Sequence, residues 1–341
     1  MAFLRGQERL VKRTVGMYLL TQLDALGWFA AQAPYGATGP LTLIDHVPAA
    51  GELVMADELI LNIGGCASNV ALALGKLGVA ASLCGRVGDD AFGRYVGDVL
   101  RTHGVDTSSL TVDPRLATSQ SLIINVRGQD RRFIHTFGAN RGLSAADVAA
   151  SITPATRVLY VGGYLILPGL DADELAEVFR AARRRGITTV LDVATPGPGE
   201  YLRHLLPVLP HTDVFLPNTD ESALILNEAD PVRQALAFRE AGAGRVVITC
   251  GDLGAVAASA STRVRLGTFD VPFVDATGGG DAFDAGYIAG LLDGRDELGC
   301  LRMASAVGAS CVRAVGTTDG VFTRAEADAF LADRSLAVEA L

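Results

Sequence analysis

Three consecutive glycines followed by an acidic residue form the segment of the chain best suited to chemistry. Gly278, Gly279 and Gly280 directly precede Asp281, which opens an apolar helical pattern. Glycines lack Cβ atoms, so their backbone N–H groups can converge on an anion at the positive end of that helix. A neighbouring carboxylate can accept the proton of an attacking hydroxyl while the amides stabilise a transferred phosphoryl group. The segment predicts a phosphoryl-transfer centre, and the alternative interpretation is a surface turn with an N-cap.

A second glycine motif lies far upstream, where Gly64 and Gly65 precede a helical pattern that begins near Val70. Two small residues at a strand-to-helix turn would let a polyol approach the backbone. Asn69 carries both donor and acceptor atoms and therefore suits a pair of sugar hydroxyls. The alternative is a plain helix start, with Ser68 or Asn69 as its cap.

The two motifs, taken in order, resemble the signatures of the ribokinase-like (PfkB) carbohydrate kinases. Residues 275–281 are similar to the family pattern D-T-x-G-A-G-D, with Ala276 in place of the usual Thr, Ser, Pro or Val. Residues 64–71 resemble the first signature of the family. Further matches follow in family order, at residues 83–93, 132–140, 214–221 and 246–254. The resemblance therefore covers residues 48–316.

The resemblance implies an α/β fold, namely a ribokinase-like three-layer sandwich with a mostly parallel central sheet and a small β lid. It implies a single domain over residues 1–341, with lid strands within residues 45–62 and 119–137. The residues themselves agree, because strand and helix patterns alternate from Val158 onward, as in parallel β-α-β units. Ligands of such sheets gather beyond the carboxyl ends of the strands. The polar and glycine residues expected at these ends are Gly162, Gly163, Asp192, Asn218, Thr249 and Gly251.

The same resemblance implies ATP and Mg²⁺ as cofactors. Asn218 and Glu221 match the family's N-x-x-E, whose residues help to organise magnesium and phosphate, with Glu221 acting through water. Thr249, Gly251 and Gly254 match the strand and turn that flank the nucleotide. Taken alone, Asn218 and Glu221 also fit a helix cap and a first-turn glutamate. The sequence holds no G-x-x-x-x-G-K-[ST] loop, so ATP must be bound in another manner.

Other site residues follow from the resemblance alone. Asp275 and Thr277 would lend oxygens to a monovalent cation such as K⁺, as in several relatives. Asn140 ends a lid segment that leads back toward the sugar site. The sugar-binding aspartate of the family is matched loosely by Asp24, which lies at an unusual distance from the glycine of the first strand. Asp45 is the rival candidate for this role.

Composition agrees with an enzyme of this kind that acts on a small molecule. The 341 residues carry a net charge of -9, which argues against a basic groove for nucleic acid. No apolar stretch is long and uncharged enough for a membrane span. The five cysteines lack the paired spacing of a zinc site or a redox motif, so reduced thiols in the cytoplasm are expected. Cys66 differs from the others, because a thiolate is stabilised at a helix start.

The N-terminal segment is interpreted as a first buried strand rather than a signal peptide. Its apolar run, residues 15–20, is short, and Glu8 and Asp24 interrupt the surrounding pattern. Residues 28–43, which are rich in Gly, Pro and Ala, are interpreted as an insertion beside the mouth of the substrate site. Exposed edges of the lid strands would permit a homodimer.

These observations lead to one hypothesis, an ATP-dependent kinase that phosphorylates a hydroxyl of a sugar or sugar-like molecule. Asp281 is the expected general base, and the amides of residues 278–280 are the expected anion hole. Two alternatives stay open: a nucleoside or hydroxymethylpyrimidine-type kinase of the same fold, and a non-catalytic sugar-binding homologue. The residues do not rank the individual sugars or nucleosides.

Overall fold

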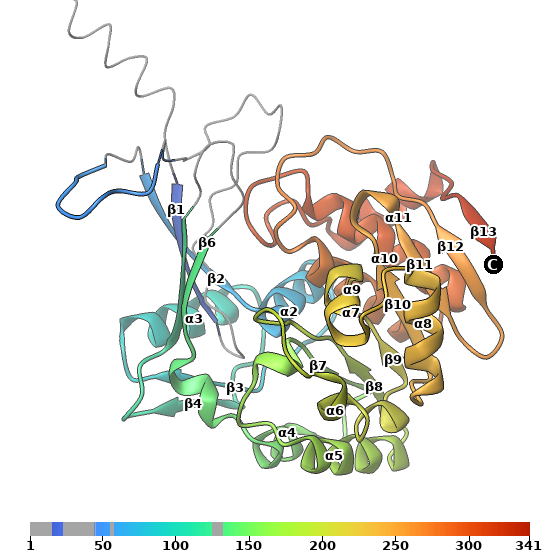
Figure 1. Ribbon diagram of the computed structural model, residues 1–341, viewed down its shortest axis with the longest axis horizontal. Helices are drawn as coiled ribbons and strands as arrows, with labels where there is room; N and C mark the ends of the chain where they lie inside the picture. The colour runs from blue at the N-terminus through green and yellow to red at the C-terminus, as the bar shows by residue number, and fades with distance from the viewer. Residues whose placement is uncertain (1–15, 23–43, 45, 55–57, 125–131) are drawn as a thin grey trace, which may run out of the picture.

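A seven-stranded sheet forms the centre of the protein in the computed structural model, which describes residues 16–22, 44, 46–54, 58–124 and 132–341 (Figure 1). Its strand order is β13-β12-β11-β10-β9-β8-β7. The four strands from β7 to β10 pair in parallel, and the remaining three pairs are antiparallel. The mostly parallel central sheet is therefore confirmed. The strands are β7 (Val158–Val161), β8 (Thr188–Leu191), β9 (Val214–Phe215), β10 (Arg245–Thr249), β11 (Ala255–Ala258), β12 (Arg263–Leu266) and β13 (Val338–Ala340).

Helices cover both faces of this sheet because its strands are apolar on both sides. Val246 and Ile248 of β10 pack into one core, and Val247 between them packs into the other. Burial on both faces is typical of parallel strands in α/β proteins. The helices of the Val247 core are α2 (Cys66–Lys76), α9 (Gly279–Leu292), α10 (Glu297–Cys311) and α11 (Arg324–Ala332). Those of the opposite core are α4 (Ala145–Ser151), α5 (Ala172–Arg184), α6 (Leu202–Leu205), α7 (Thr219–Leu226) and α8 (Pro231–Glu240).

A second, smaller sheet lies beside the central one and has the strand order β2-β1-β5-β6 (Figure 1). Its strands are β1 (Gly16–Gln22), β2 (Glu58–Gly64), β5 (Ser119–Ile124) and β6 (Arg132–Thr136). Three of these strands, β2, β5 and β6, overlap the segments 45–62 and 119–137 that are expected to form the lid. The expected first strand is present as β1, and it lies inside the small sheet, parallel to β2 and antiparallel to β5. Residues 46–54 form a turn and no strand.

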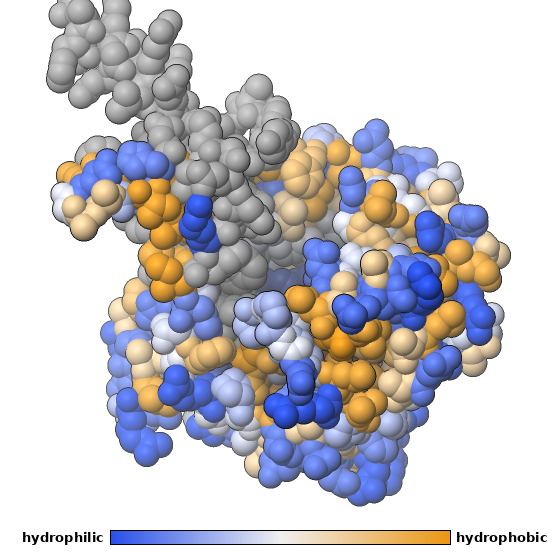
Figure 2. Space-filling view, viewed as in Figure 1, coloured by the Kyte–Doolittle hydropathy of each residue, from blue (hydrophilic) through white to orange (hydrophobic). Residues whose placement is uncertain are grey.

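The edge strands of the small sheet carry exposed apolar side chains. Leu61 on β2 and Ile134 on β6 are both exposed. In Figure 2, apolar and hydrophilic patches lie side by side where Figure 1 shows the small sheet. β2 and β6 are the outer strands of this sheet in the described part of the chain, and outer strands can associate with another chain. The homodimer stays a prediction.

The remaining described elements lie between α2 and β11 along the chain. A third, two-stranded parallel sheet and a helix follow α2, and four short 3₁₀ helices lie at turns. Among the described residues, no helix combines the length and the apolar character that crossing a membrane requires. These elements are β3 (Gly85–Gly88), α3 (Ala91–Thr102), β4 (Leu110–Asp113), η1 (Gly138–Gly142), η2 (Tyr164–Ile166), η3 (Leu209–His211) and η4 (Gly251–Leu253).

Small residues allow α9 to pack closely against α10. A Cβ atom added to Gly286 would lie 2.8 Å from the Cα of Ala304 and from the carbonyl oxygen of Met303. One added to Gly290 would lie 2.9 Å from the Cα of Cys300. These are backbone atoms, which cannot move aside as a flexible side chain can. The glycines therefore fix the position of α9, the helix that carries Asp281.

We expect Gly286→Ala to destabilise the protein by about 1–3 kcal/mol, because the added methyl group overpacks the contact between α9 and α10. Urea denaturation measures this change. Gly97→Ala is the matched control, since a Cβ there meets only the flexible head group of Arg101, at 3.1 Å. Alanine favours the helix by about 1 kcal/mol over glycine, so the control should be neutral or slightly stabilised. Equal losses in the two variants would contradict the role of this helix contact.

Candidate active site

The glycine run forms the turn that opens α9, as the sequence predicts. Gly278 is the N-cap residue and has a φ of 78°, in the left-handed region. A Cβ atom there would also lie 2.3 Å from the carbonyl oxygen of Thr317, so only glycine fits. The N–H of Gly279 donates to Ala276 at 3.2 Å. A Cβ atom on Gly280 would meet no described atom within 4 Å, so there is open space beside this residue.

The two glycine motifs meet through a hydrogen bond. Asn69 Nδ2 donates to Asp281 Oδ2 at 2.7 Å, although the residues are 212 positions apart in the sequence. Asn69 is almost fully buried, and its Oδ1 has no hydrogen-bond partner. Asp281 therefore does not point away into solvent. An acceptor oxygen without a partner, beside a carboxylate, suits a ligand with hydroxyl groups.

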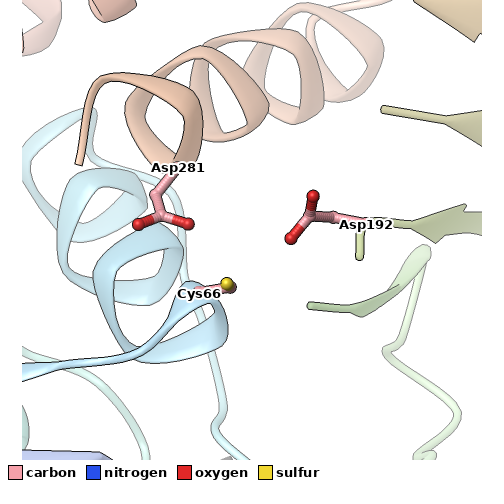
Figure 3. A group of neighbouring side chains, drawn as sticks. All are labelled: Cys66, Asp192 and Asp281. Atoms are coloured by element: carbon pink, nitrogen blue, oxygen red, sulfur yellow. The ribbon is translucent and has the colours of Figure 1, made fainter. Parts of the chain in front are cut away.

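The backbone of the upstream motif also requires glycine. Gly64 is the last residue of β2, and Gly65 is the N-cap residue of α2 with a φ of 107°. Neither Ser68 nor Asn69 caps this helix, because both lie inside it. The alternative interpretation of the motif as a side-chain cap is therefore wrong. The turn leaves the first residue of α2, Cys66, facing the same space as Asp281 (Figure 3).

Asp192 lies opposite Asp281 across this space. It directly follows β8, and ligand atoms of Cys66, Asp192 and Asp281 lie within 4.8 Å of one another. Figure 3 shows the three side chains converging from the start of α2, the end of β8 and the first turn of α9. The sequence predicts Asp192 at the end of a strand and Cys66 at a helix start, but it does not predict that the two side chains meet.

A half-buried tyrosine links Asp192 to a second aspartate on α9. Tyr160 Oη lies 2.9 Å from Asp284 Oδ2 and 3.3 Å from Asp192 Oδ2. The N–H of Gly163 also donates to Asp192, at 3.2 Å. Because the hydroxyl has a single proton, it can donate to only one of the two carboxyl groups at a time. Sequence reasoning missed Tyr160 and Asp284, and the one available signal was that Asp284 follows Asp281 by one helical turn.

Burial raises the pKa of every carboxyl group in this cluster. Desolvation raises the pKa of Asp281 to about 6. It raises that of Asp192 to about 7, with a further contribution from the charge of Asp281. The pKa values of Asp284 and Glu221 are also well above the usual range, because burial adds to repulsion from Asp192 and Asp281. Perturbed pKa values in one place are typical of functional sites.

Asn218 and Glu221 form a capping box at the start of α7. Asn218 Oδ1 accepts from the N–H of Glu221 at 2.8 Å, and Glu221 Oε2 accepts from the N–H of Asn218 at 3.0 Å. The interpretation as a cap is thus correct. It does not exclude a second role, because the carboxyl group of Glu221 is also close enough to Asp192 and Asp281 to feel their charges.

The residues predicted to flank the nucleotide lie next to this capping box. Thr249 ends β10 and forms a parallel bridge with Asn218, so the ends of β9 and β10 are adjacent. Gly251 and Gly254 both have positive φ, at 59° and 89°. A Cβ on Gly254 would lie 2.0 Å from the carbonyl oxygen of Leu266, whereas one on Gly251 would meet nothing within 4 Å. Gly254 therefore shapes the turn and Gly251 leaves open space.

Asp275 organises the loop that leads into the glycine run. Its Oδ1 accepts from the N–H and the hydroxyl of Thr277, at 2.9 and 2.7 Å, and its Oδ2 accepts from the N–H of Gly316 at 3.2 Å. The monovalent cation proposed for Asp275 and Thr277 stays a prediction. Asn140 is buried in η1, directly after β6. Asp24, Asp45 and the predicted insertion at residues 28–43 lie outside the described residues.

Comparison with known proteins first gives the class of the fold. A solved structure of an E. coli protein provisionally named ribokinase II, in complex with ATP and magnesium, matches with a TM-score of 0.69. The match covers 94% of this chain and 99% of the other, at 23% sequence identity. The three-layer, ribokinase-like fold predicted from the motifs is therefore confirmed.

The sequence comparisons give the family. The model of the pfkB family of carbohydrate kinases matches residues 37–324. Ribokinase of Bacillus subtilis is 28% identical over 287 residues, which cover 84% of this chain and 94% of the relative. The 2-dehydro-3-deoxygluconokinase of Thermoproteus tenax is 28% identical over 277 residues, with 79% and 85% coverage. The chain belongs to the pfkB family of carbohydrate kinases, and it is a phosphotransferase that uses an alcohol group as acceptor.

The raised pKa of Asp192 predicts how stability changes with pH. The pKa of Asp192 is near 4 in the unfolded chain and about 7 in the folded chain. Between these two pH values the folded state binds one proton more than the unfolded state, so the free energy of unfolding falls as pH rises. Asparagine cannot bind this proton. The free energy of unfolding of Asp192→Asn should therefore fall less between pH 5 and pH 8 than that of the unchanged protein. Urea denaturation at both pH values measures the difference.

The matched control is Asp270→Asn, which changes an exposed carboxylate. It should show the same pH dependence as the unchanged protein. A fall in stability that is as steep in Asp192→Asn as in the unchanged protein would contradict the assignment of this pKa to Asp192.

Proposed function

We propose that this kinase transfers the γ-phosphoryl group of ATP to a hydroxyl of a sugar or sugar-like acceptor, with Asp281 as the general base. The hydrogen bond from Asn69 to Asp281 carries this proposal. It puts the motif suited to hydroxyl groups next to the motif suited to a phosphoryl group. The family assignment supports a carbohydrate as the acceptor.

Asp281 has the properties of a base that works near neutral pH. Its raised pKa, of about 6, leaves it ionised at pH 7 and still basic enough to take a proton as the hydroxyl attacks. The amides of residues 278–280, at the N-terminus of α9, would stabilise the charge on the transferred group. The N–H of Gly279 would then share or release its hydrogen bond to the carbonyl oxygen of Ala276. Phosphoryl transfer needs mainly positioning and charge stabilisation from the protein, and both are supplied here by one helix end.

The nucleotide would lie along the ends of β9 and β10. In this proposal Thr249, Gly251 and Gly254 flank ATP, and Asn218 and Glu221 hold the magnesium–phosphate group through water. Bound magnesium would neutralise charge on the ATP phosphates. The carboxyl group of Glu221 fits this role, because magnesium keeps several waters and takes few direct protein ligands. Asp275 and Thr277 are the proposed oxygen ligands of a K⁺ ion beside the same loop.

The acceptor would lie between the small sheet and α9. Gly64 and Gly65 would let it approach the backbone, Asn69 would bind its hydroxyls, and Asn140 would contact it from the small sheet. We propose that this sheet is the lid that excludes water during transfer. Asp24 or Asp45 would supply a further contact.

The alternatives receive less support. The two relatives named above are sugar kinases, which favours a sugar over a nucleoside or a hydroxymethylpyrimidine. A non-catalytic sugar-binding protein would have no use for a carboxylate at the N-terminus of α9. A cytoplasmic location stays part of the proposal, because the five cysteines lack the paired spacing of a redox motif.

Asp281→Asn tests the base directly. We expect kcat to fall by about 10²–10⁴, because the amide cannot accept the proton, while ATP and acceptor still bind. Magnesium- and ATP-dependent ADP release, screened first over sugars and nucleosides, measures kcat, and calorimetry measures binding. Asp270→Asn, at an exposed carboxylate, should keep full activity. Turnover of Asp281→Asn at the unchanged rate would show that the assigned base is wrong.

The pH profile tests the link between Asn69 and Asp281. Because the base must be ionised, kcat/KM should rise with pH through about 6 and then level off. The Asn69 amide stabilises the ionised carboxylate, so Asn69→Ala should move this rise to higher pH. Asn140→Ala is the control, since it should raise KM and leave the pH of the rise unchanged. An unshifted profile in Asn69→Ala would contradict the coupling.

A further inference from the structure

A thiol and a second carboxyl group converge on the proposed base Asp281, and the proposed phosphoryl transfer uses neither of them. The sulfur of Cys66 and carboxylate oxygens of Asp192 and Asp281 lie within 4.8 Å of one another (Figure 3). Three separate elements supply them, namely α2, the end of β8 and α9. Such a set of one sulfur and two oxygen donors matches the ligands of a borderline-soft metal ion.

We propose that Cys66, Asp192 and Asp281 bind a zinc ion. Zinc takes four ligands in a tetrahedron, with bonds of about 2.0–2.3 Å, so neighbouring ligand atoms end about 3.5 Å apart. The three donors therefore need to close by about 1 Å, which side-chain rotation at the half-buried Cys66 and Asp281 can supply. Magnesium prefers six oxygen ligands and suits this set poorly. The site would thus distinguish zinc from the magnesium that accompanies ATP.

Asn69 supplies an independent reason to expect a ligand here. It is 2% exposed, and its Oδ1 has no hydrogen-bond partner. The amide group reaches the cluster, because its Nδ2 lies 2.7 Å from Asp281 Oδ2. This hydrogen bond holds the amide in place and leaves Oδ1 as its unsatisfied atom. A water molecule on the zinc ion would fill the fourth position of the tetrahedron and would donate to Oδ1 of Asn69.

The charges around the cluster favour a divalent cation. The buried Asp284 and the half-buried Glu221 add two further carboxyl groups. Desolvation and then the charges of Asp192 and Asp281 raise the pKa of each. A cation would relieve this repulsion. Binding requires the Cys66 thiol to lose its proton, so each zinc ion bound releases that proton and any held by the two aspartates. Zinc should therefore bind more tightly as pH rises.

Zinc at this site would block the kinase, an inference that depends on Asp281 being the base in the proposed function. The ion would occupy the oxygen that receives the proton of the acceptor. It would also take Asn69 away from the hydroxyls of the sugar. Zinc should accordingly compete with the acceptor, and an excess of magnesium should not relieve the inhibition.

The first experiment measures binding without turnover. The full chain, freed of metal, is titrated with cadmium chloride alone, and the ultraviolet band of a cadmium–thiolate bond is followed. We expect one ion per chain and a band that Cys66→Ser abolishes. Cys250→Ser is the matched control, because Cys250 is another half-buried thiol. Its sulfur donates to the carbonyl oxygen of Ile248. A band that survives in Cys66→Ser, or no band in the unchanged chain, would overturn the proposal.

Calorimetry with zinc chloride tests the oxygen ligands. Asp192→Asn should weaken zinc binding by roughly ten-fold or more, and Asp270→Asn should leave it unchanged. Equal zinc affinity in Asp192→Asn and the unchanged chain would overturn the assigned ligand set. Binding through Cys66 without inhibition of turnover would support the metal site and contradict Asp281 as the base. Absence of binding in an active kinase would reject the metal site and leave the proposed function intact.

Discussion

The hydrogen bond between Asn69 and Asp281 is the interaction on which the rest of the site depends. It joins α2 to α9, and both helices pack in the core on one face of the central sheet. That packing is close because α9 presents glycines to α10, which fixes the first turn of α9 at the rim of the sheet. The parallel strands bring Asp192, Asn218 and Thr249 to the same rim. The acceptor motif and the phosphate motif can therefore act on one pair of substrates.

Gathering carboxyl groups at this rim is costly for the folded state. Burial of Asp192, Asp281, Asp284 and Glu221 disfavours their ionised forms, and each charge repels the others. The structure offsets part of this cost with local donors, namely the hydroxyl of Tyr160, the amide of Asn69 and backbone N–H groups. In the proposed function, a bound cation or a hydrogen-bonding ligand would offset more of this cost.

Local sequence patterns predicted the architecture well. Short apolar strands alternating with helices indicated the parallel sheet, and the capping box at Asn218 followed from residue types three positions apart. The contacts of Tyr160 with Asp192 and Asp284 could not be predicted, because they join residues far apart in sequence. The position of β1 inside the small sheet also escaped prediction, since strand order depends on long-range pairing. Spacing alone likewise gave no reason to place the Cys66 thiol beside Asp281.

The division of the site between two parts of the fold explains how one chemistry can serve different acceptors. Asp281 and the glycine turn belong to α9, which glycine contacts with α10 hold in place. Residues proposed to contact the acceptor come mainly from the small sheet and from the turns that follow it, such as Gly65 and Asn140. Substitutions in the second group can change the acceptor without moving the base. Cys66 lies where the two groups meet, and the proposed zinc site would connect it to the proposed base.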